Sequence, residues 1–409
     1  MKYEHYSIKD VKKSSARELF TVVSTFAGGG GSSTGYRLAG GKVIAINEFV
    51  PEAIKTYSEN FPDTHIIPGD IKKLTGKEFL EQGNLQVGEL DILDGSPPCS
   101  AFSVAGKRDK NWKGAVKSIE SRFDFDTGEV IEGSVEVKDG VKSYSEDQVV
   151  EAIEDLFLEY IRIAKEIQPK VIIAENVKGI TMGVARKKLI EFQNLFEKIN
   201  PGYLVSYHVL NAADYGVPQA RERLFFVCIR QDVADAIGLN FMNVEGITTP
   251  KRTTPNHISI YDAINHIEND SEEEKELLDF VQGSFQKKFI ELLPFNPRKH
   301  TKPSDKQFRD KNPKGSCFNM IRPAIQLPSP TLTQAGQQKG VSGVFHYAKN
   351  RKLTIKELKI LMSMPDDYIL TGKFDQKAER LGRMVAPKMM AALATTVYEN
   401  ILKPYRENT

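Results

Sequence analysis

Short apolar segments alternate with helical segments throughout the first hundred residues, and this alternation limits the possible folds more than any other feature. Strands are expected at residues 20–26, 42–48, 65–71 and 90–93, and a helix at 51–60 joins two of them. Because parallel strands need long, usually helical, crossovers, this order favours a parallel sheet over hairpins. The sequence therefore predicts an α/β fold with a doubly wound, mostly parallel sheet.

The composition is that of an ordinary globular protein. Hydrophobic residues make up 40% and charged residues 27% of the 409 positions, which allows a large core and a second, smaller domain. No apolar run approaches the length of a membrane span, and residues 1–10 are too polar for a secretory signal. The net charge of +2 favours no class of partner by itself, so a polyanionic partner must be argued from the local distribution of charge.

Three cysteines, Cys99, Cys228 and Cys317, are too widely separated for a disulfide framework or a metal knuckle. We therefore expect no metal centre and a reducing, cytoplasmic compartment. Cys99 differs from the other two because it follows the strand at 90–93 through a turn in which two prolines fix φ. A thiol on such a stiff turn, at the strand end where open α/β sheets build their sites, is either a packed small hydrophobe or a nucleophile.

A glycine-rich turn at residues 27–35 follows the first strand and precedes a helix expected from Tyr36. Glycines there let backbone N–H groups approach a ligand closely, which indicates a nucleotide-like ligand. Glu48 ends the second strand about 20 residues beyond the glycines, the spacing at which an acid can hold a ribose diol. Asp70 ends the third strand and could accept a proton from an adenine amino group. A solvated strand-end carboxylate is the alternative for Glu48.

Two polar stretches lie outside this pattern. The stretch 107–149 begins with basic residues around Trp112 and continues with hairpin signals, so we expect an insertion at about 114–148. It could act as a lid or a nucleic-acid contact, or be a surface ornament. The second stretch, 287–314, combines Lys and Arg with aromatic residues and few acids. It is typical of a phosphate-tracking surface, with a solvated basic loop as the alternative.

The order of the motifs carries more information than any one of them. In sequence they are Phe26-Ala27-Gly28, Glu48, Asp70, Pro98-Cys99, Glu175-Asn176-Val177, Gln219-Ala220-Arg221-Glu222-Arg223, a Pro-Ser-Pro-Thr-Leu-Thr segment at 328–333, and Gly382–Pro387. This series resembles the DNA cytosine-5 methyltransferases. The resemblance runs from about Thr21 to Leu402, apart from the variable stretch between Arg230 and about Ile321.

The resemblance implies a Rossmann-like, S-adenosylmethionine-dependent methyltransferase fold with a smaller target-recognition domain. We expect a catalytic, cofactor-binding domain at 1–230 and 375–409, a target-recognition domain at 231–345, and a connecting helix and turn at 346–374. The cofactor would be S-adenosyl-L-methionine, leaving S-adenosyl-L-homocysteine as product. The cofactor-binding residues would be Phe26, Ala27, Gly28, Gly30, Glu48, Phe49, Asp70, Ile71, Pro98, Leu156 and Met384.

The chemistry of cytosine explains the catalytic residues that the resemblance implies. Carbon 5 is a poor nucleophile, and a thiolate that adds to carbon 6 turns the ring into an enamine-like species that can attack a methyl donor. By resemblance Cys99 is this nucleophile, Glu175 binds and protonates N3, and Arg223 meets O2. Arg221 would steady the same pocket, and either arginine could help to ionise the thiol. For both arginines a strand-flanking ion pair is the alternative.

The implied substrate is double-stranded DNA, from which the target cytosine is flipped out, because a thiol cannot reach a base inside the duplex. Sequence readout would fall to residues near 231–320, through base edges in the major groove. We expect a monomer in the cytoplasm, encoded by a bacterium or a phage, with no membrane contact. A cognate restriction or defence component is left open as a further partner.

Two features depart from the family pattern. Gly382-Arg383 stands where Gly-Asn is usual, which leaves no family contact assigned to position 383, and Ser32-Ser33 replace an aromatic residue found in many members. Three other functions are weighed: an RNA or tRNA cytosine-5 methyltransferase of the same family, a catalytically silent DNA-binding homologue, and a nicotinamide dehydrogenase. The sizeable variable region argues against the tRNA-acting branch, the intact motif residues argue against a silent homologue, and a dehydrogenase gives no role to the Pro-Pro-Cys turn.

Overall fold

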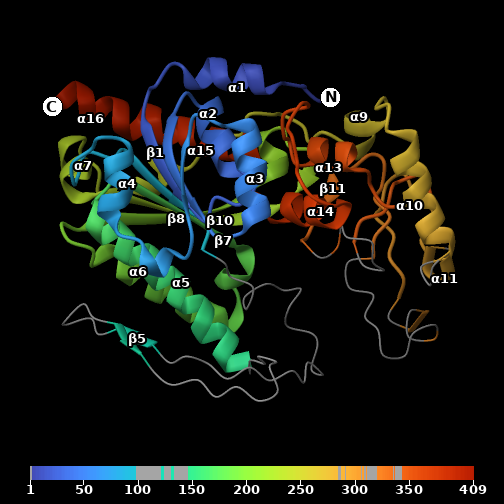
Figure 1. The fold of residues 1–409 in the computed structure, drawn as a ribbon, viewed down its shortest axis with the longest axis horizontal. Coiled ribbons are helices and arrows are strands. Elements are labelled where there is room, and N and C mark those ends of the chain that lie inside the picture. Colours follow the sequence, from blue (N-terminus) through green and yellow to red (C-terminus); the bar gives the residue numbers. More distant parts are fainter. Residues whose placement is uncertain are drawn as a thin grey trace.

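The computed structural model describes residues 2–97, 121–123, 130–132, 146–283, 287–290, 292–304, 306–307, 310, 320–334, 336 and 343–409. Its centre is a seven-stranded sheet in the order β3-β2-β1-β4-β7-β10-β8 (Figure 1). The strands are β1 Thr21–Thr25, β2 Lys42–Glu48, β3 His65–Pro68, β4 Ile92–Gly95, β7 Val171–Val177, β8 Tyr203–Asn211 and β10 Glu222–Arg230. Neighbouring strands are parallel except where β10 pairs with β7 and β8. The predicted doubly wound, mostly parallel sheet is confirmed.

Helices cover both faces of the sheet, because each strand sends alternate side chains to opposite sides. Val22 lies in one apolar core and its chain neighbour Val23 in a second. The helices on the first side are α1 Ile8–Ser15, α2 Gly31–Leu38, α3 Pro51–Asn60, α15 Pro387–Val397 and α16 Lys403–Asn408, and those on the second are α4 Gly76–Gln82, α5 Glu146–Ile167 and α6 Arg186–Glu197. Figure 1 shows α1, α2 and α16 above the sheet and α5 and α6 below it.

The chain after β10 adds shorter helices and a small core of its own. The helices are α7 Gln231–Ala236, α8 Val244–Thr248, α9 Ile260–Ile264, α10 Ser271–Gly283, α11 Lys287–Ile290, α13 Ile355–Leu361 and α14 Phe374–Arg383. Val233, Val244 and Ile260 still belong to the first core. The separate small core consists of Val281, Phe289, Ile290, Leu293, Met320 and Phe345. Helices α10 and α11 lie at the right of Figure 1, whereas α7 lies at the left beside the sheet.

Two short strand pairs complete the fold. β9 Gln219–Ala220 runs parallel to β11 Ser329–Pro330. This pairing places the segment that follows the variable stretch beside the segment that leads into β10. β5 Ser121–Phe123 and β6 Val130–Glu132 form an antiparallel hairpin inside the expected insertion. The rest of that insertion lies outside the described residues.

Two glycines move element boundaries away from those expected. Gly30 has a φ of 85°, a left-handed conformation that suits glycine, and α2 begins directly after it at Gly31 rather than at Tyr36. Gly69 has a φ of 121°, so β3 ends at Pro68 and the chain turns into a short 3-10 helix at Ile71–Lys73. Both changes place a loop or a helix start at the carboxyl edge of the sheet.

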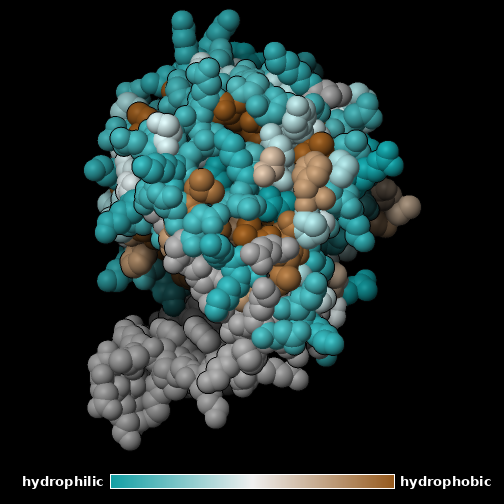
Figure 2. All heavy atoms as spheres, turned by 90° about the vertical axis from the view of Figure 1, so that its right-hand side faces the viewer, coloured by the Kyte–Doolittle hydropathy of each residue, from teal (hydrophilic) through white to brown (hydrophobic). Residues whose placement is uncertain are grey.

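The surface of the described part is largely polar. Its helices include none that is both long and apolar enough to span a membrane. On the face at the right of Figure 1, hydrophilic residues surround separate hydrophobic patches (Figure 2).

Candidate active site

The carboxyl ends of the parallel strands β3, β2, β1, β4 and β7 lie along one edge of the sheet, where open α/β folds bind their ligands. Phe26 directly follows β1, Glu48 ends β2, and Glu175 lies two residues before the end of β7. The sheet therefore collects at one edge residues that are up to 149 positions apart, from Phe26 to Glu175. Pro98 and Cys99 lie outside the described residues, so their roles stay predictions.

The glycine-rich turn is packed on one side and open on the other. A Cβ at Gly29 would come within 2.0 Å of Met384 Cε, and one at Gly31 within 2.3 Å of the Val385 carbonyl oxygen. At Gly28, with a φ of 55°, a Cβ would have no neighbour nearer than a carbonyl oxygen at 4.0 Å. The C-terminal part of the chain thus supports the turn from behind, and the open side at Gly28 leaves room for a ligand against the backbone.

Glu48 lies beside the open side of this turn and bonds to its backbone. Its Oε2 accepts from the Gly28 N–H at 2.6 Å, and its Oε1 accepts from the N–H groups of Phe49 and Val50, both at 2.8 Å. A carboxylate has about four acceptor positions, so three backbone donors leave Oε2 able to accept from a ligand hydroxyl. Beside it Phe49 is 69% exposed, and several other large apolar residues of the described chain, such as Phe241, are exposed as well. An exposed ring next to a held carboxylate fits a nucleoside.

Asp70, Ile71 and Leu156 frame the next part of the edge. Asp70 Oδ1 accepts from the Lys72 N–H at 3.1 Å and so caps the short 3-10 helix. The side chain of Ile71 is buried in the second core, and Leu156 packs against the same core from α5. A ligand here would therefore meet the backbone of Ile71 rather than an open side chain.

Glu175 and Arg223 form a buried ion pair at the carboxyl edge. Arg223 Nε lies 3.0 Å from Glu175 Oε1, and both side chains are nearly enclosed. Burial raises the pKa of Glu175 above its usual value, although Arg223, Arg221 and a hydrogen bond from Ser96 act in the opposite direction. Ser96 is three residues before Cys99 in the chain. The acid is thus linked to the last described residues before the cysteine.

Arg221 is placed differently from Arg223, although only one residue separates them. Its Nη1 donates to the Leu332 carbonyl at 2.8 Å, and its Nη2 donates to the carbonyls of Gly382 at 3.0 Å and Met384 at 2.9 Å. Burial, followed by the charge of Arg223, lowers the pKa of Arg221 well below its usual value. Its hydrogen bonds join three separate segments, as those of a scaffold residue do, and its charge also lowers the pKa of Glu175.

Asp94 is a site-edge acid that the sequence reasoning passed over. It lies on β4, fully buried, and accepts from Ser24 Oγ at 2.6 Å and from the Tyr36 hydroxyl at 3.0 Å. Burial raises the pKa of Asp94 to about 7, with the Glu175 charge acting in the same direction. The signal available in the sequence was an acid inside an otherwise apolar strand.

Cys228 differs from the nucleophile expected at position 99. It is fully buried in β10, and burial raises its thiol pKa well above the usual value. A neutral thiol in an apolar core is inert, so Cys228 is a packing residue.

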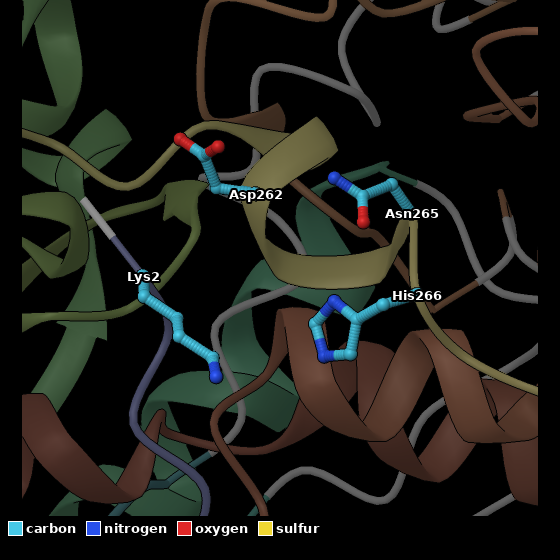
Figure 3. Close-up of a pocket in the computed structure, with 4 residues that line it drawn as sticks. All are labelled: Lys2, Asp262, Asn265 and His266. Carbon is cyan, nitrogen blue, oxygen red and sulfur yellow. The ribbon is translucent and has the colours of Figure 1, made fainter.

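A hollow lined by Lys2, Asp262, Asn265 and His266 lies away from this edge, between the N-terminal segment and α9 (Figure 3). Near it, His266 Nε2 and His5 Nε2 are 3.2 Å apart, and His5 Nδ1 lies 2.9 Å from Asp366 Oδ1. These contacts tie the N-terminus to α9. Within the part of the chain that the structure covers, no group of three His, Cys, Asp or Glu side chains could hold a metal.

The fold and the residues at the carboxyl edge of the sheet together define a class of protein. A parallel sheet whose second strand ends in an acid that holds the glycine turn after the first strand is typical of Rossmann-like, nucleoside-binding enzymes. The model of the family described as C-5 cytosine-specific DNA methylase matches residues 20–115 and 143–399. The chain therefore belongs to the C-5 cytosine-specific DNA methylases, and it is a DNA cytosine-5 methyltransferase. Members of this family use S-adenosylmethionine as methyl donor.

Individual relatives agree with this assignment. The chain is 28% identical to the type II methyltransferase M1.HphI of Haemophilus parahaemolyticus, over 92% of this chain and 86% of the relative. It is 27% identical to the type II methyltransferase M.DdeI of Desulfomicrobium norvegicum, over 93% and 89%. Among solved structures, the Spodoptera frugiperda DNMT2 covers 93% of this chain and 99% of its own, with a TM-score of 0.56 at 17% identity, which confirms the fold.

Proposed function

We propose that this enzyme methylates a flipped-out cytosine in duplex DNA through a transient bond between Cys99 Sγ and carbon 6. The thiolate adds to carbon 6, and the electron pair of the 5,6 double bond becomes available at carbon 5. Carbon 5 would take the methyl group as the S–CH3 bond of the donor breaks, and the donor would leave as the neutral thioether S-adenosylhomocysteine. A base then removes the proton from carbon 5, and the thiolate leaves, restoring the double bond. Every atom added to the ring apart from the methyl group departs again.

The buried Glu175–Arg223 pair carries this proposal. Addition at carbon 6 increases the electron density on N3 and O2 of the ring. A carboxyl group whose pKa is raised by burial can hold a proton at N3, and an adjacent guanidinium can donate to O2. The carboxyl group and the guanidinium lie 3.0 Å apart, and together they match the two neighbouring atoms N3 and O2 of the cytosine edge.

The proposed methyl-donor site is the open side of the glycine turn. Bound there, S-adenosylmethionine supplies an electrophilic methyl group on a sulfonium. Glu48 would accept from the ribose hydroxyls through its remaining lone pairs, and Phe49 would cover the adenine. Asp70 and the Ile71 backbone would meet the base edge, with Phe26, Ala27, Gly28 and Gly30 lining the turn. Met384 would act by packing behind Gly29. Pro98 and Leu156 remain part of the proposed cofactor site, as the family resemblance implies.

The recognition region is proposed to centre on the small separate core. Residues 233–264 share the first core with the catalytic part, whereas the core from Val281 to Phe345 stands apart. These observations favour a recognition domain that begins near 270, later than the expected 231. The type II methyltransferases among the relatives support a role in a restriction-modification system. A monomeric, cytoplasmic enzyme that acts without a metal completes the proposal.

The decisive experiment uses DNA that carries 5-fluorocytosine, which cannot lose its substituent from carbon 5 as a proton. Incubation with S-adenosylmethionine should trap a protein–DNA adduct that survives denaturation, and Cys99→Ser should abolish it. Plasmid from the expressing strain, analysed by bisulfite sequencing, supplies the recognised sequence for the substrate. Cys228→Ser is the matched control, because this thiol is buried and should leave the adduct unchanged.

The same assay separates the alternatives. An adduct formed on RNA but not on DNA would replace the DNA proposal with the RNA-directed one. Binding to DNA without an adduct on any substrate would favour the catalytically silent homologue.

A further inference from the structure

We propose that Arg162, on α5, is a positioning residue for the adenine side of the methyl-donor site. This inference rests on the proposed function, because it concerns the loop that would frame adenine. The loop runs from Gly69 to Gly76, between β3 and α4, and includes Asp70 and Ile71. Nothing in the sequence motifs points to Arg162.

The guanidinium of Arg162 holds the loop by its backbone. Its Nη2 donates to the carbonyl oxygens of Ile71 at 3.0 Å and Leu74 at 2.8 Å. Both carbonyls belong to the 3-10 turn that Asp70 caps, so their position sets the position of the Asp70 carboxylate. A planar guanidinium donates to two carbonyls in a fixed geometry, whereas the three donors of a lysine ammonium rotate freely and do not fix the direction of these bonds.

Two acids on the same helix fix the guanidinium. Arg162 Nε donates to Glu159 Oε2 at 2.8 Å, and Nη1 donates to Glu166 Oε1 at 2.6 Å. The second oxygen of Glu166 accepts from the Gly76 N–H at 2.5 Å, at the start of α4. The Arg162 side chain is only 19% exposed. Arg162 therefore holds the loop at its 3-10 turn, and Glu166 holds it at its far end.

The opposite end of the loop is held from β2. The buried amide of Asn47 donates to the carbonyls of Ile67 at 3.0 Å and Gly69 at 2.9 Å. The residue after it is Glu48, whose carbonyl accepts from the Gly69 N–H at 3.1 Å. The loop is thus held from two sides, by β2, which carries the proposed ribose-binding Glu48, and by α5, which carries Arg162.

Helix α5 is also fastened to the catalytic strands. The Tyr160 hydroxyl lies 3.0 Å from the carbonyl oxygens of both Leu93, on β4, and Ile173, on β7, and its single O–H is shared between them. β4 leads to the Cys99 turn and β7 carries Glu175. Through α5, the adenine frame is therefore held in a constant position relative to the strands that would bind the cytosine.

The test compares Arg162→Ala and Arg162→Lys with the wild type in the full-length protein. Calorimetry should show S-adenosylhomocysteine binding weakened about tenfold in Arg162→Ala and less in Arg162→Lys. The KM for S-adenosylmethionine should rise by a similar factor with kcat changed less than twofold, since the cytosine pocket is untouched. Lys165→Ala, an exposed change on the same helix, is the control and should match the wild type.

A second readout does not depend on the cofactor. Amide hydrogen exchange of the apo protein should be faster at 70–76 in Arg162→Ala and unchanged in β7. Unaltered exchange and unaltered S-adenosylhomocysteine binding in a folded Arg162→Ala protein would overturn the inference. If the wild type itself failed to bind S-adenosylhomocysteine, the proposed methyl-donor site would fall, while the exchange comparison would still decide whether Arg162 holds the loop.

Discussion

Arg223 and Glu175 are diagonal neighbours on one face of the sheet. Arg223 on β10 pairs with Val177 on β7, two positions beyond Glu175, and its Nε lies 3.0 Å from the Glu175 carboxylate. Alternate residues of a strand share a face, so the antiparallel pairing itself brings the two side chains together. The guanidinium orients the acid, while burial raises the pKa of the acid. The proposed cytosine pocket is therefore built by strand pairing, before any loop closes over it.

Replacing Glu175 with Gln should slow the methyl-transfer step without weakening DNA binding to the same extent. The amide keeps the shape and one acceptor but cannot supply a proton, and losing such a group costs about 100-fold or more in rate. Single-turnover kinetics and the DNA dissociation constant measure the two effects separately. Glu222→Gln, an exposed acid paired with Lys178, is the control. Equal losses in rate and binding would mean that Glu175 only binds the base.

The pH dependence of the same step follows from the direction of the Glu175 shift. Because burial raises the pKa of this carboxyl, it keeps its proton to a higher pH than an exposed glutamate would. As the pH rises through the raised pKa, the protonated form is lost, so single-turnover rates should show an alkaline decline. Glu175→Gln should lack that decline, since its amide does not titrate. A decline of the same size in the variant would assign it to another group.

Arg221→Met should destabilise the fold rather than act on chemistry alone. The change leaves the carbonyls of Leu332, Gly382 and Met384 buried without their donor, at a cost of about 3 kcal/mol in the free energy of unfolding. Denaturant titration measures it. Arg252→Met removes an exposed arginine and should change the stability far less. If Arg221→Met unfolded at the wild-type denaturant concentration, the scaffold role would be wrong.

Glu48→Gln should weaken cofactor binding and leave DNA binding intact. The amide presents one oxygen where the carboxylate presents two, while three backbone N–H groups already use acceptor positions there. We expect the dissociation constant for S-adenosylhomocysteine to rise about tenfold by calorimetry. Glu52→Gln, in the first turn of α3, provides a nearby control. If Glu48→Gln bound S-adenosylhomocysteine as the wild type does, the ribose contact would have to be assigned to another residue.

Asp94 should make the protein less stable as the pH rises. Its folded pKa of about 7 lies above the model-compound value of 3.8, so between these values the folded state holds a proton that the unfolded state has released. The contribution of this proton to the free energy of unfolding is greatest below the unfolded pKa. It is lost as the pH rises through the folded pKa of about 7, and the loss is about 4 kcal/mol at most. Denaturation at pH 5 and pH 8 should show a smaller difference in Asp94→Asn than in the wild type. An unchanged difference would exclude Asp94 as the source.

The sequence alone was sufficient for the mostly parallel sheet, the order of its motifs and the position of an acid at the end of the second strand. Strand and helix periodicity is local, so these features can be predicted from the chain itself. The resemblance carried by these motifs was also sufficient for the family, because their order is as specific as their residues.

Only the tertiary structure separated Arg221 from Arg223. The resemblance gave Arg223 the contact with O2 and Arg221 a steadying role in the same pocket. The fold shows the contacts of each: Arg221 donates to carbonyls 111 to 163 positions away, and Arg223 lies against Glu175. Asp94 and Arg162 likewise acquired a role only through their partners. Local patterns determine which elements form, but the burial, pKa and hydrogen bonds of a charged side chain depend on segments that packing brings together, and no local pattern encodes that packing.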